Sequence, residues 1–146
     1  MASSSPSRLL SHSPFLRVIA ASFGAVPLGY GINAFLRPMS AMNIFFLFPS
    51  ATDPLLEPTM YLYAIRAIYM GLTVMIAAYY GHRKTMGAIL IALSGISLVD
   101  GAVVRTYGGE NSLGEKGAEN IGHWIWGPPC ALVGALLMGI ADRQVG

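Results

Sequence analysis

Hydrophobic residues along the chain gather in four stretches, which are separated by segments of very different polarity. A helix needs about 20 mainly apolar residues to cross a bilayer. Four segments meet this length, at 15–35, 61–80, 85–104 and 121–140. The pattern predicts an all-α integral membrane protein, a four-helix bundle in a single domain over 15–142. A Ser/Pro-rich, flexible tail over 1–14 precedes it.

The links between these stretches predict how the helices are arranged. Only "GHRK" separates the second and third spans, so we expect these helices to be antiparallel neighbours. The link at 39–48, "MSAMNIFFLF", is apolar and predicts a re-entrant or interfacial helix. The pair Pro128 and Pro129 predicts a kink or a broken first turn in the fourth span. Small residues would let helices approach closely, and the candidates are Gly71, Gly87, Gly95, Gly134 and Gly139.

Composition agrees with a membrane protein and excludes several other classes. Hydrophobic residues make up 54% of the 146 residues and charged residues only 11%, against about 25% charged in soluble domains. The mean hydropathy is +0.57. A net charge of +2 does not suggest a nucleic-acid partner, and the single cysteine, Cys130, excludes an internal disulfide.

The distribution of charge predicts the orientation. One side of the bundle receives five basic residues and one acid, and the other receives three basic residues and five acids. The positive-inside rule then places both termini in the cytoplasm and the two long links on the opposite side.

Polar side chains within the spans gather toward the end that carries the long links. Arg66 and Asp100 fall at similar depth on neighbouring helices, roughly 6 to 8 Å inside their spans at 1.5 Å per residue. Ionisable groups within a span usually face the bundle interior or a wet cavity. We therefore expect an Arg66–Asp100 ion pair in a polar cavity. Two further sets of polar residues join it at this end, namely Tyr30, Asn33 and Arg37 from the first span and Tyr63 and Tyr69 from the second. His123, Trp124 and Trp126 join it from the fourth span.

Several structural explanations compete with a functional one. A buried Asp–Arg pair can simply fix the register of two helices. Tyr61, Tyr107 and Trp124 suit an aromatic belt at the membrane interface, and Arg37 and Arg105 suit snorkelling. The convergence of polar groups from four helices at one depth favours a functional cavity.

The residue types in this set indicate acid–base chemistry. A carboxylate beside arginine and histidine can take a proton from water or a hydroxyl group, and a tyrosine or histidine can stabilise a developing alkoxide. We expect no cofactor, because haem-attachment, metal-ligand and dinucleotide motifs are absent from the sequence. We expect no metal either; a site built from His123 with Asp100, Glu119 or Glu57 is the weaker alternative.

Three segments carry a resemblance to a known group of proteins, namely "GYGINAFLRPMSAMNIFFLFP", "YLYAIRAIYMGL" and "DGAVVRTYGGE…NIGHWIWGPP". They resemble a family of small four-helix fungal membrane proteins, some of which belong to natural-product gene clusters. The resemblance covers about residues 23–137. Within that family, the chain looks like the membrane epoxide hydrolases of aurovertin- and citreoviridin-type polyketide pathways. This implies a location in the endoplasmic reticulum membrane and a cavity lined by Asp100, Arg66 and His123, with Arg37 and Asn33.

The resulting hypothesis is a membrane-embedded enzyme that hydrolyses the epoxide of a lipophilic polyene polyketide, coupled to ring closure. Its catalytic residues would be Asp100, Arg66 and His123. Its substrate-binding residues would be Asn33, Arg37, Tyr30, Tyr63, Tyr69, Trp124 and Trp126. This hypothesis is compatible with a homo-oligomer, and with a flavin epoxidase that supplies the epoxide in a preceding step. The alternatives are another lipid-tailoring enzyme, such as a cyclase, isomerase or oxygenase-like protein, and a non-catalytic scaffold or carrier.

Overall fold

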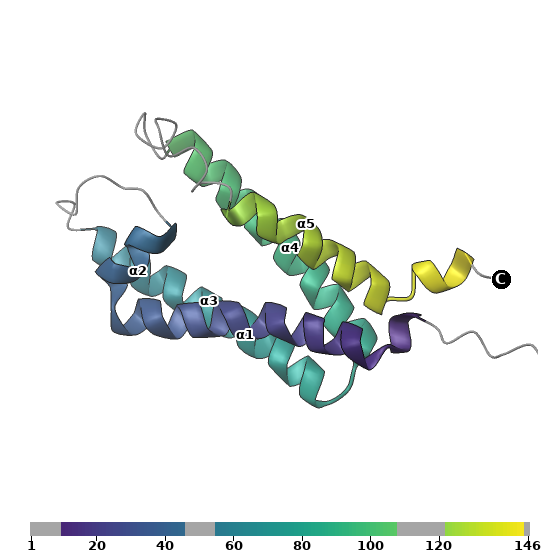
Figure 1. The fold of residues 1–146 in the computed structure, drawn as a ribbon. Helices are drawn as coiled ribbons and strands as arrows, with labels where there is room; N and C mark the ends of the chain where they lie inside the picture. Colours follow the sequence, from purple (N-terminus) through teal and green to yellow (C-terminus); the bar gives the residue numbers. More distant parts are fainter. Residues whose placement is uncertain (1–9, 46–54, 108–121, 145–146) are drawn as a thin grey trace, which may run out of the picture.

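The computed structural model describes residues 10–45, 55–107 and 122–144, and this part of the chain is helical with no strand (Figure 1). The all-α prediction is therefore confirmed for these residues. The elements are η1 (Leu10–His12), α1 (Pro14–Leu36), α2 (Pro38–Phe45), α3 (Leu56–Tyr79), α4 (Arg83–Tyr107), α5 (Gly122–Leu137) and η4 (Ala141–Gln144).

Three of the helices are long and apolar enough to cross a membrane, over Pro14–Leu36, Glu57–Tyr79 and Arg83–Val103. They correspond to the first three predicted spans. The fourth predicted span, 121–140, is the 16-residue helix α5, whose apolar part covers only Ile125–Leu137.

Prolines lie in the first turn of α3 and inside α5. Helix α3 begins at Leu56, five residues before the predicted 61. Pro58 lies in its first turn, where the missing N–H has no helical partner in any case, so the proline does not delay the helix. Pro128 and Pro129 lie inside α5 instead, and the helix continues through both of them rather than breaking in its first turn.

The long helices associate in two pairs, α1 with α3 and α4 with α5. Figure 1 shows the pairs close together near the chain termini and diverging toward α2. Helices α3 and α4 are joined by the predicted short turn, but each makes most of its contacts with its other partner. A short link makes two helices antiparallel without making their interface the largest one.

Glycines set the closeness of both pairs. A side-chain carbon on Gly71 would lie 2.5 Å from the carbonyl oxygen of Gly24, across the α1–α3 interface. Gly87 and Gly134 have the same relationship across α4 and α5. The prediction was wrong for Gly95, because no other part of the described structure lies within 4 Å of its would-be side chain. Gly139 follows α5 in a turn with a φ of +83°.

The main apolar core occupies the end of the bundle near the chain termini. Its largest fully buried members are Met86, Leu90, Leu137, Val74 and Cys130. The Cys130 thiol donates to the Leu90 carbonyl at 3.3 Å, which ties α5 to α4. A smaller cluster of Ala34, Ala41, Met60 and Ala64 joins α1, α2 and α3 at the far end. The larger apolar core therefore lies at the end of the bundle opposite the one where the sequence predicted the polar side chains.

The end of the expected tail is folded. Residues 10–12 form η1, and Ser11 is completely buried. Arg83 donates to the hydroxyl of Ser11 and, at 3.4 Å, to the carbonyl of Leu137. Asp142 accepts from the backbone N–H of Ser11 at 3.4 Å. We call Ser11, Arg83 and Asp142 the terminal clasp, because they connect η1, the start of α4 and η4. Residues 1–9 of the predicted tail lie outside the described residues.

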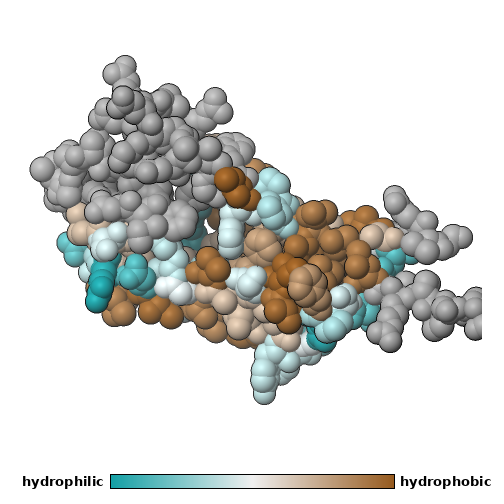
Figure 2. All heavy atoms as spheres, viewed as in Figure 1, coloured by the Kyte–Doolittle hydropathy of each residue, from teal (hydrophilic) through white to brown (hydrophobic). Residues whose placement is uncertain are grey.

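Large apolar side chains cover the outside of the helices. Phe15, Leu62, Val99 and Leu132 are each more than 60% exposed. Figure 2 shows that apolar residues dominate the middle of the visible face, while hydrophilic residues lie toward its ends. An apolar outer surface of this extent suits contact with lipid.

Candidate functional site

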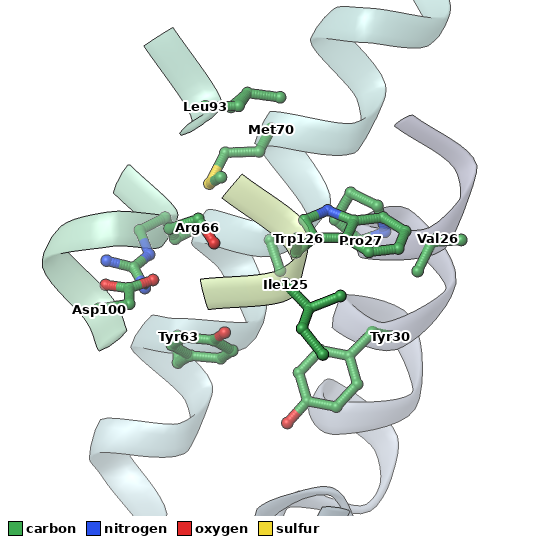
Figure 3. A pocket seen from close by; sticks show the side chains of 12 residues that line it. Val26, Pro27, Tyr30, Tyr63, Arg66, Met70, Leu93, Asp100, Ile125 and Trp126 are labelled. Carbon is green, nitrogen blue, oxygen red and sulfur yellow. The ribbon is translucent and has the colours of Figure 1, made fainter. Parts of the chain in front are cut away.

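A cavity of about 340 Å³ lies between the two helix pairs and receives side chains from all four long helices (Figure 3). Ligand pockets typically have about 300 to 1,000 Å³. Its walls consist of Val26, Pro27, Tyr30, Tyr63, Arg66, Ala67, Met70, Leu93, Ser97, Asp100, Ile125 and Trp126. The cavity arises where the helix pairs begin to diverge, beyond the main core.

The predicted ion pair between Arg66 and Asp100 forms in the wall of this cavity. Nη2 of Arg66 donates to Oδ2 of Asp100 at 2.7 Å, joining α3 to α4. The side chain of Asp100 is 17% exposed and that of Arg66 is 41% exposed. The pair connects the two helix pairs beside the cavity, so the register role and a functional role are both compatible with its position.

The ion pair lies well inside both of its helices. Nine residues separate Arg66 from Glu57, where the apolar span of α3 begins, which is about 14 Å at 1.5 Å per residue. Asp100 lies seven residues before the end of α4 at Tyr107, or about 10 Å. Both helices extend beyond the predicted span ends, α3 to Leu56 and α4 to Tyr107, so the pair lies further from the helix ends than from the predicted span ends.

Two tyrosines continue the polar wall from the ion pair toward α2. The guanidinium carbon of Arg66 lies 4.8 Å from the centre of the Tyr63 ring, within the range of a cation–π contact. Tyr63 makes an edge-to-face contact with Tyr30, with ring centres 6.0 Å apart. The Tyr30 hydroxyl donates to the carbonyl of Ala41 in α2 at 3.0 Å. Contacts therefore run continuously from α2 to Asp100.

The opposite wall is apolar and partly aromatic. Figure 3 shows Trp126 beside Pro27 and Val26, across the cavity from Arg66 and Asp100. The Trp126 ring lies 4.9 Å from that of Phe23, tilted by 59°. This contact joins α5 to α1 and fixes the indole on the cavity surface. A flat apolar ligand could lie against it.

Other residues that the sequence placed in the site lie elsewhere. Asn33 is half-buried but does not line the cavity, and Arg37 is exposed just beyond the end of α1. Tyr69 is 64% exposed and points away from it. Each step of three residues turns the helix by about 300°, so Tyr69 lies about 120° around α3 from Tyr63. Two residues spaced by three share one face of a helix, but a third residue at the same spacing has turned away from that face.

Two predicted residues remain outside the description. His123 and Trp124 occupy the first turn of α5, but their side chains lie outside the described residues. The site as described therefore contains five of the ten predicted residues, namely Tyr30, Tyr63, Arg66, Asp100 and Trp126.

The sequence missed most of the apolar lining. Val26, Met70, Leu93 and Ile125 carry no signal that separates a cavity wall from a surface facing lipid, since both are apolar. Pro27 offered a better clue. A proline inside a helix leaves one carbonyl without its usual N–H donor, and it often marks a place where the helix is not simply packed against a neighbour.

The arrangement can support proton transfer in an apolar setting. A carboxylate held by an arginine can accept a proton, and nearby hydroxyl groups and the guanidinium can stabilise negative charge. Such interactions are stronger where water is excluded.

Comparison with known proteins places the chain in one family. No curated protein and no solved structure matches it. Residues 24–137 match the model of a domain of unknown function, DUF4267. This region includes the whole cavity lining and every long helix except the start of α1. Because the match covers most of the chain, the protein belongs to the DUF4267 family.

Proposed function

We propose that this protein is a membrane-embedded epoxide hydrolase that acts on a lipophilic substrate bound in the cavity between the helix pairs. The observation that carries the proposal is the Arg66–Asp100 ion pair in the wall of an otherwise largely apolar cavity. Charged residues within a span are costly, and a lining position suits a functional use. The resemblance of the sequence to epoxide hydrolases of polyene polyketide pathways supports the same reaction.

In the proposed reaction, Asp100 acts as the general base. Its carboxylate takes a proton from a water molecule as the water oxygen forms a bond to one epoxide carbon. The bond from that carbon to the epoxide oxygen breaks, and its electron pair stays on the oxygen. Arg66 contributes by keeping Asp100 ionised and oriented, through the contact at 2.7 Å. If a hydroxyl group of the substrate replaces the water, the same step closes an oxygen heterocycle.

The alkoxide that forms needs a proton donor. Tyr63 is the described candidate, because it lines the cavity and lies against Arg66. His123 is a second candidate from the sequence. The donor gives its proton to the alkoxide and recovers one from the protonated Asp100, directly or through water, so the diol leaves with the protein unchanged. Trp126 would hold the apolar part of a polyene substrate.

The proposal includes a topology and a location. Helices α1, α3, α4 and α5 would each cross the membrane of the endoplasmic reticulum, with both termini in the cytoplasm. The excess of basic residues on the side of the termini supports this orientation. Helix α5 is short for a span, but the chain continues in apolar residues to Ile140.

The function is tested by expressing Asp100→Asn in microsomes and supplying a polyene epoxide. We expect diol or cyclised product from the wild type and at least a hundredfold slower turnover from Asp100→Asn, since general-base catalysis contributes about 10² to 10⁴-fold. Glu57→Gln is a matched control, because Glu57 is an exposed carboxylate at the start of α3, outside the cavity lining. Full turnover by a folded Asp100→Asn protein would contradict the proposal.

The topology is tested by cysteine labelling in a Cys130→Ser background, which removes the single natural cysteine. Ser4→Cys, Ser112→Cys and Val145→Cys would be exposed in turn to an impermeant maleimide in sealed, cytoplasmic-side-out microsomes. We expect labelling of Ser4→Cys and Val145→Cys, and of Ser112→Cys only after permeabilisation. If Val145→Cys were labelled only after permeabilisation, α5 would not cross the membrane.

A further inference from the structure

The charges in the cavity wall cancel. Among the described residues that line it, Arg66 and Asp100 are those with side chains charged at neutral pH, and they are in direct contact at 2.7 Å. The remaining lining side chains are apolar or carry only uncharged polar groups, namely the hydroxyls of two tyrosines and a serine and the indole N–H of Trp126. The described cavity therefore offers polar contacts without a net charge.

This balance limits the ligands that such a cavity can hold within a bilayer. A carboxylate or ammonium group that enters the cavity brings a charge that no free counter-charge in the described lining can neutralise. Arg66 and Asp100 already neutralise each other. Uncompensated charge is strongly disfavoured where water and counterions are scarce. A hydroxyl, carbonyl, ether or epoxide group could instead form hydrogen bonds with the pair at no such penalty.

The polar and apolar walls also face each other. Figure 3 shows Arg66, Asp100 and Tyr63 on one side, with Val26, Pro27 and Trp126 on the other. Val26 is 49% exposed and Ile125 is 63% exposed, so the apolar wall extends to the outer surface of the helices. A ligand could therefore reach the cavity from the surrounding lipid, with its apolar part leading along this wall.

We infer that the cavity selects uncharged amphiphiles over fatty acids and alkylamines, and that the Arg66–Asp100 pair sets this preference by cancelling its own charge. The inference rests on the proposed function for the choice of this cavity as the substrate site. It concerns binding, however, and does not depend on whether an epoxide is opened.

The test uses Trp126 as a reporter inside the cavity. Trp124→Phe removes the other of the two tryptophans and leaves Trp126 as the single reporter. The full-length protein is placed in nanodiscs of saturated phosphatidylcholine. Three bromine-labelled amphiphiles of equal chain length, an alcohol, a carboxylic acid and an amine, are then titrated at pH 8. Bromine quenches tryptophan emission on contact, and each concentration is corrected for the measured partition of the probe into the bilayer.

A matched control measures quenching by probe dissolved in the lipid. Leu132 is 61% exposed on α5 and does not line the cavity, so a protein with Trp124→Phe, Trp126→Phe and Leu132→Trp reports on the bilayer alone. We expect its quenching to rise linearly with each probe. Trp126 should instead show saturable quenching by the alcohol, with half-saturation at roughly tenfold lower concentration than for either charged probe.

Charge substitutions make the inference specific to the pair. Asp100→Asn leaves Arg66 unpaired and should reverse the preference toward the carboxylic acid. Arg66→Gln leaves Asp100 unpaired and should favour the amine. The double variant again has no charged side chain in the described lining, so its preference should return to the alcohol. Saturable binding of the alcohol would also show that the variant still forms the cavity.

Equal half-saturation for all three probes, absence of saturable quenching, or a preference that ignores the substitutions would each overturn the inference. The outcome is separate from that of the turnover assay. If the protein preferred the alcohol, and Asp100→Asn reversed this preference, but no epoxide were opened, the inference would stand and the proposed function would be wrong.

Discussion

Gly87 in α4 and Gly134 in α5 lie so close that each occupies the space a side chain on the other would need. A side-chain carbon on either residue would be 2.6 Å from the carbonyl oxygen of its partner. The obstacle is backbone in both directions, which cannot move aside as a flexible side chain could. The two helices are therefore held at a separation that only glycine permits at this point.

Gly87→Ala or Gly134→Ala should push α4 and α5 apart and destabilise the bundle. Overpacking of this kind costs about 1 to 3 kcal/mol. The measurement is the free energy of unfolding in detergent, followed by circular dichroism as SDS is added. Gly95→Ala is the control, because Gly95 lies in the same helix with nothing within 4 Å. It should be neutral or slightly stabilising, since alanine favours a helix more than glycine does. Equal losses at positions 87 and 95 would show that close approach is not the cause.

The Arg66–Asp100 pair should show strong energetic coupling. Arg66→Gln and Asp100→Asn each leave a charged partner without its counterpart, at a cost of about 2 to 3 kcal/mol in the free energy of unfolding. The double variant loses both charges together, so it should be less destabilised than the sum of the two single variants. Coupling energies for residues in contact are about 0.5 to 3 kcal/mol. Strict additivity in the same SDS titration would show that the contact at 2.7 Å does not contribute to stability.

The sequence predicted the elements and the ion pair because both depend on a strong local signal. An uninterrupted apolar stretch has few structural options other than a long helix. A charge inside such a stretch needs a partner, and Arg66 had Asp100 at a matching depth on the next helix. The small residues Gly71, Gly87 and Gly134 were likewise identified as contact points, and each faces the backbone of another helix.

The pairing of helices and the apolar lining could not be predicted in the same way. Which helices share the largest interface depends on how well whole surfaces fit, such as the close approach of Gly24 to Gly71 between α1 and α3. The short turn after α3 carries no information about this fit. Met70 and Leu93 line a cavity, whereas Leu62 and Val99 face outward, although the residue types are alike. In a protein whose outer surface is also apolar, hydropathy does not separate inside from outside.

The terminal clasp should make stability depend on pH. Hydrogen bonds from Ser11, its side chain first, lower the pKa of Asp142, and the positive charge of Arg83 acts in the same direction. A carboxyl group whose pKa is lower in the folded state stabilises that state when ionised. Its contribution is therefore complete above the unfolded pKa, near 3.8, and is lost as the pH falls through the folded value.

Asp142→Asn should consequently reduce the loss of stability as the pH falls from about 5 to about 2, through the unfolded pKa and the lower folded pKa. The measurement is the melting temperature of the detergent-solubilised protein across this range, compared with that of the wild type. Ser11→Ala should act similarly, because it removes the hydroxyl that Arg83 also contacts. Asp142→Asn with the full acid sensitivity of the wild type would show that the clasp does not form in solution.

The last prediction concerns the attachment of α2 to the cavity wall. Tyr30→Phe removes the hydroxyl that donates to the Ala41 carbonyl at 3.0 Å, and it retains the ring that contacts Tyr63. Loss of one such hydrogen bond costs about 1 kcal/mol, and we expect the effect to be local to α2. Hydrogen exchange should show the amides of residues 39–45 exchanging about fivefold faster, with α4 and α5 unchanged. Tyr69→Phe is the matched control, because Tyr69 is 64% exposed in the middle of α3. Unchanged exchange in Tyr30→Phe would mean that packing of Ala41 against Ala34, Met60 and Ala64 holds α2 without this bond.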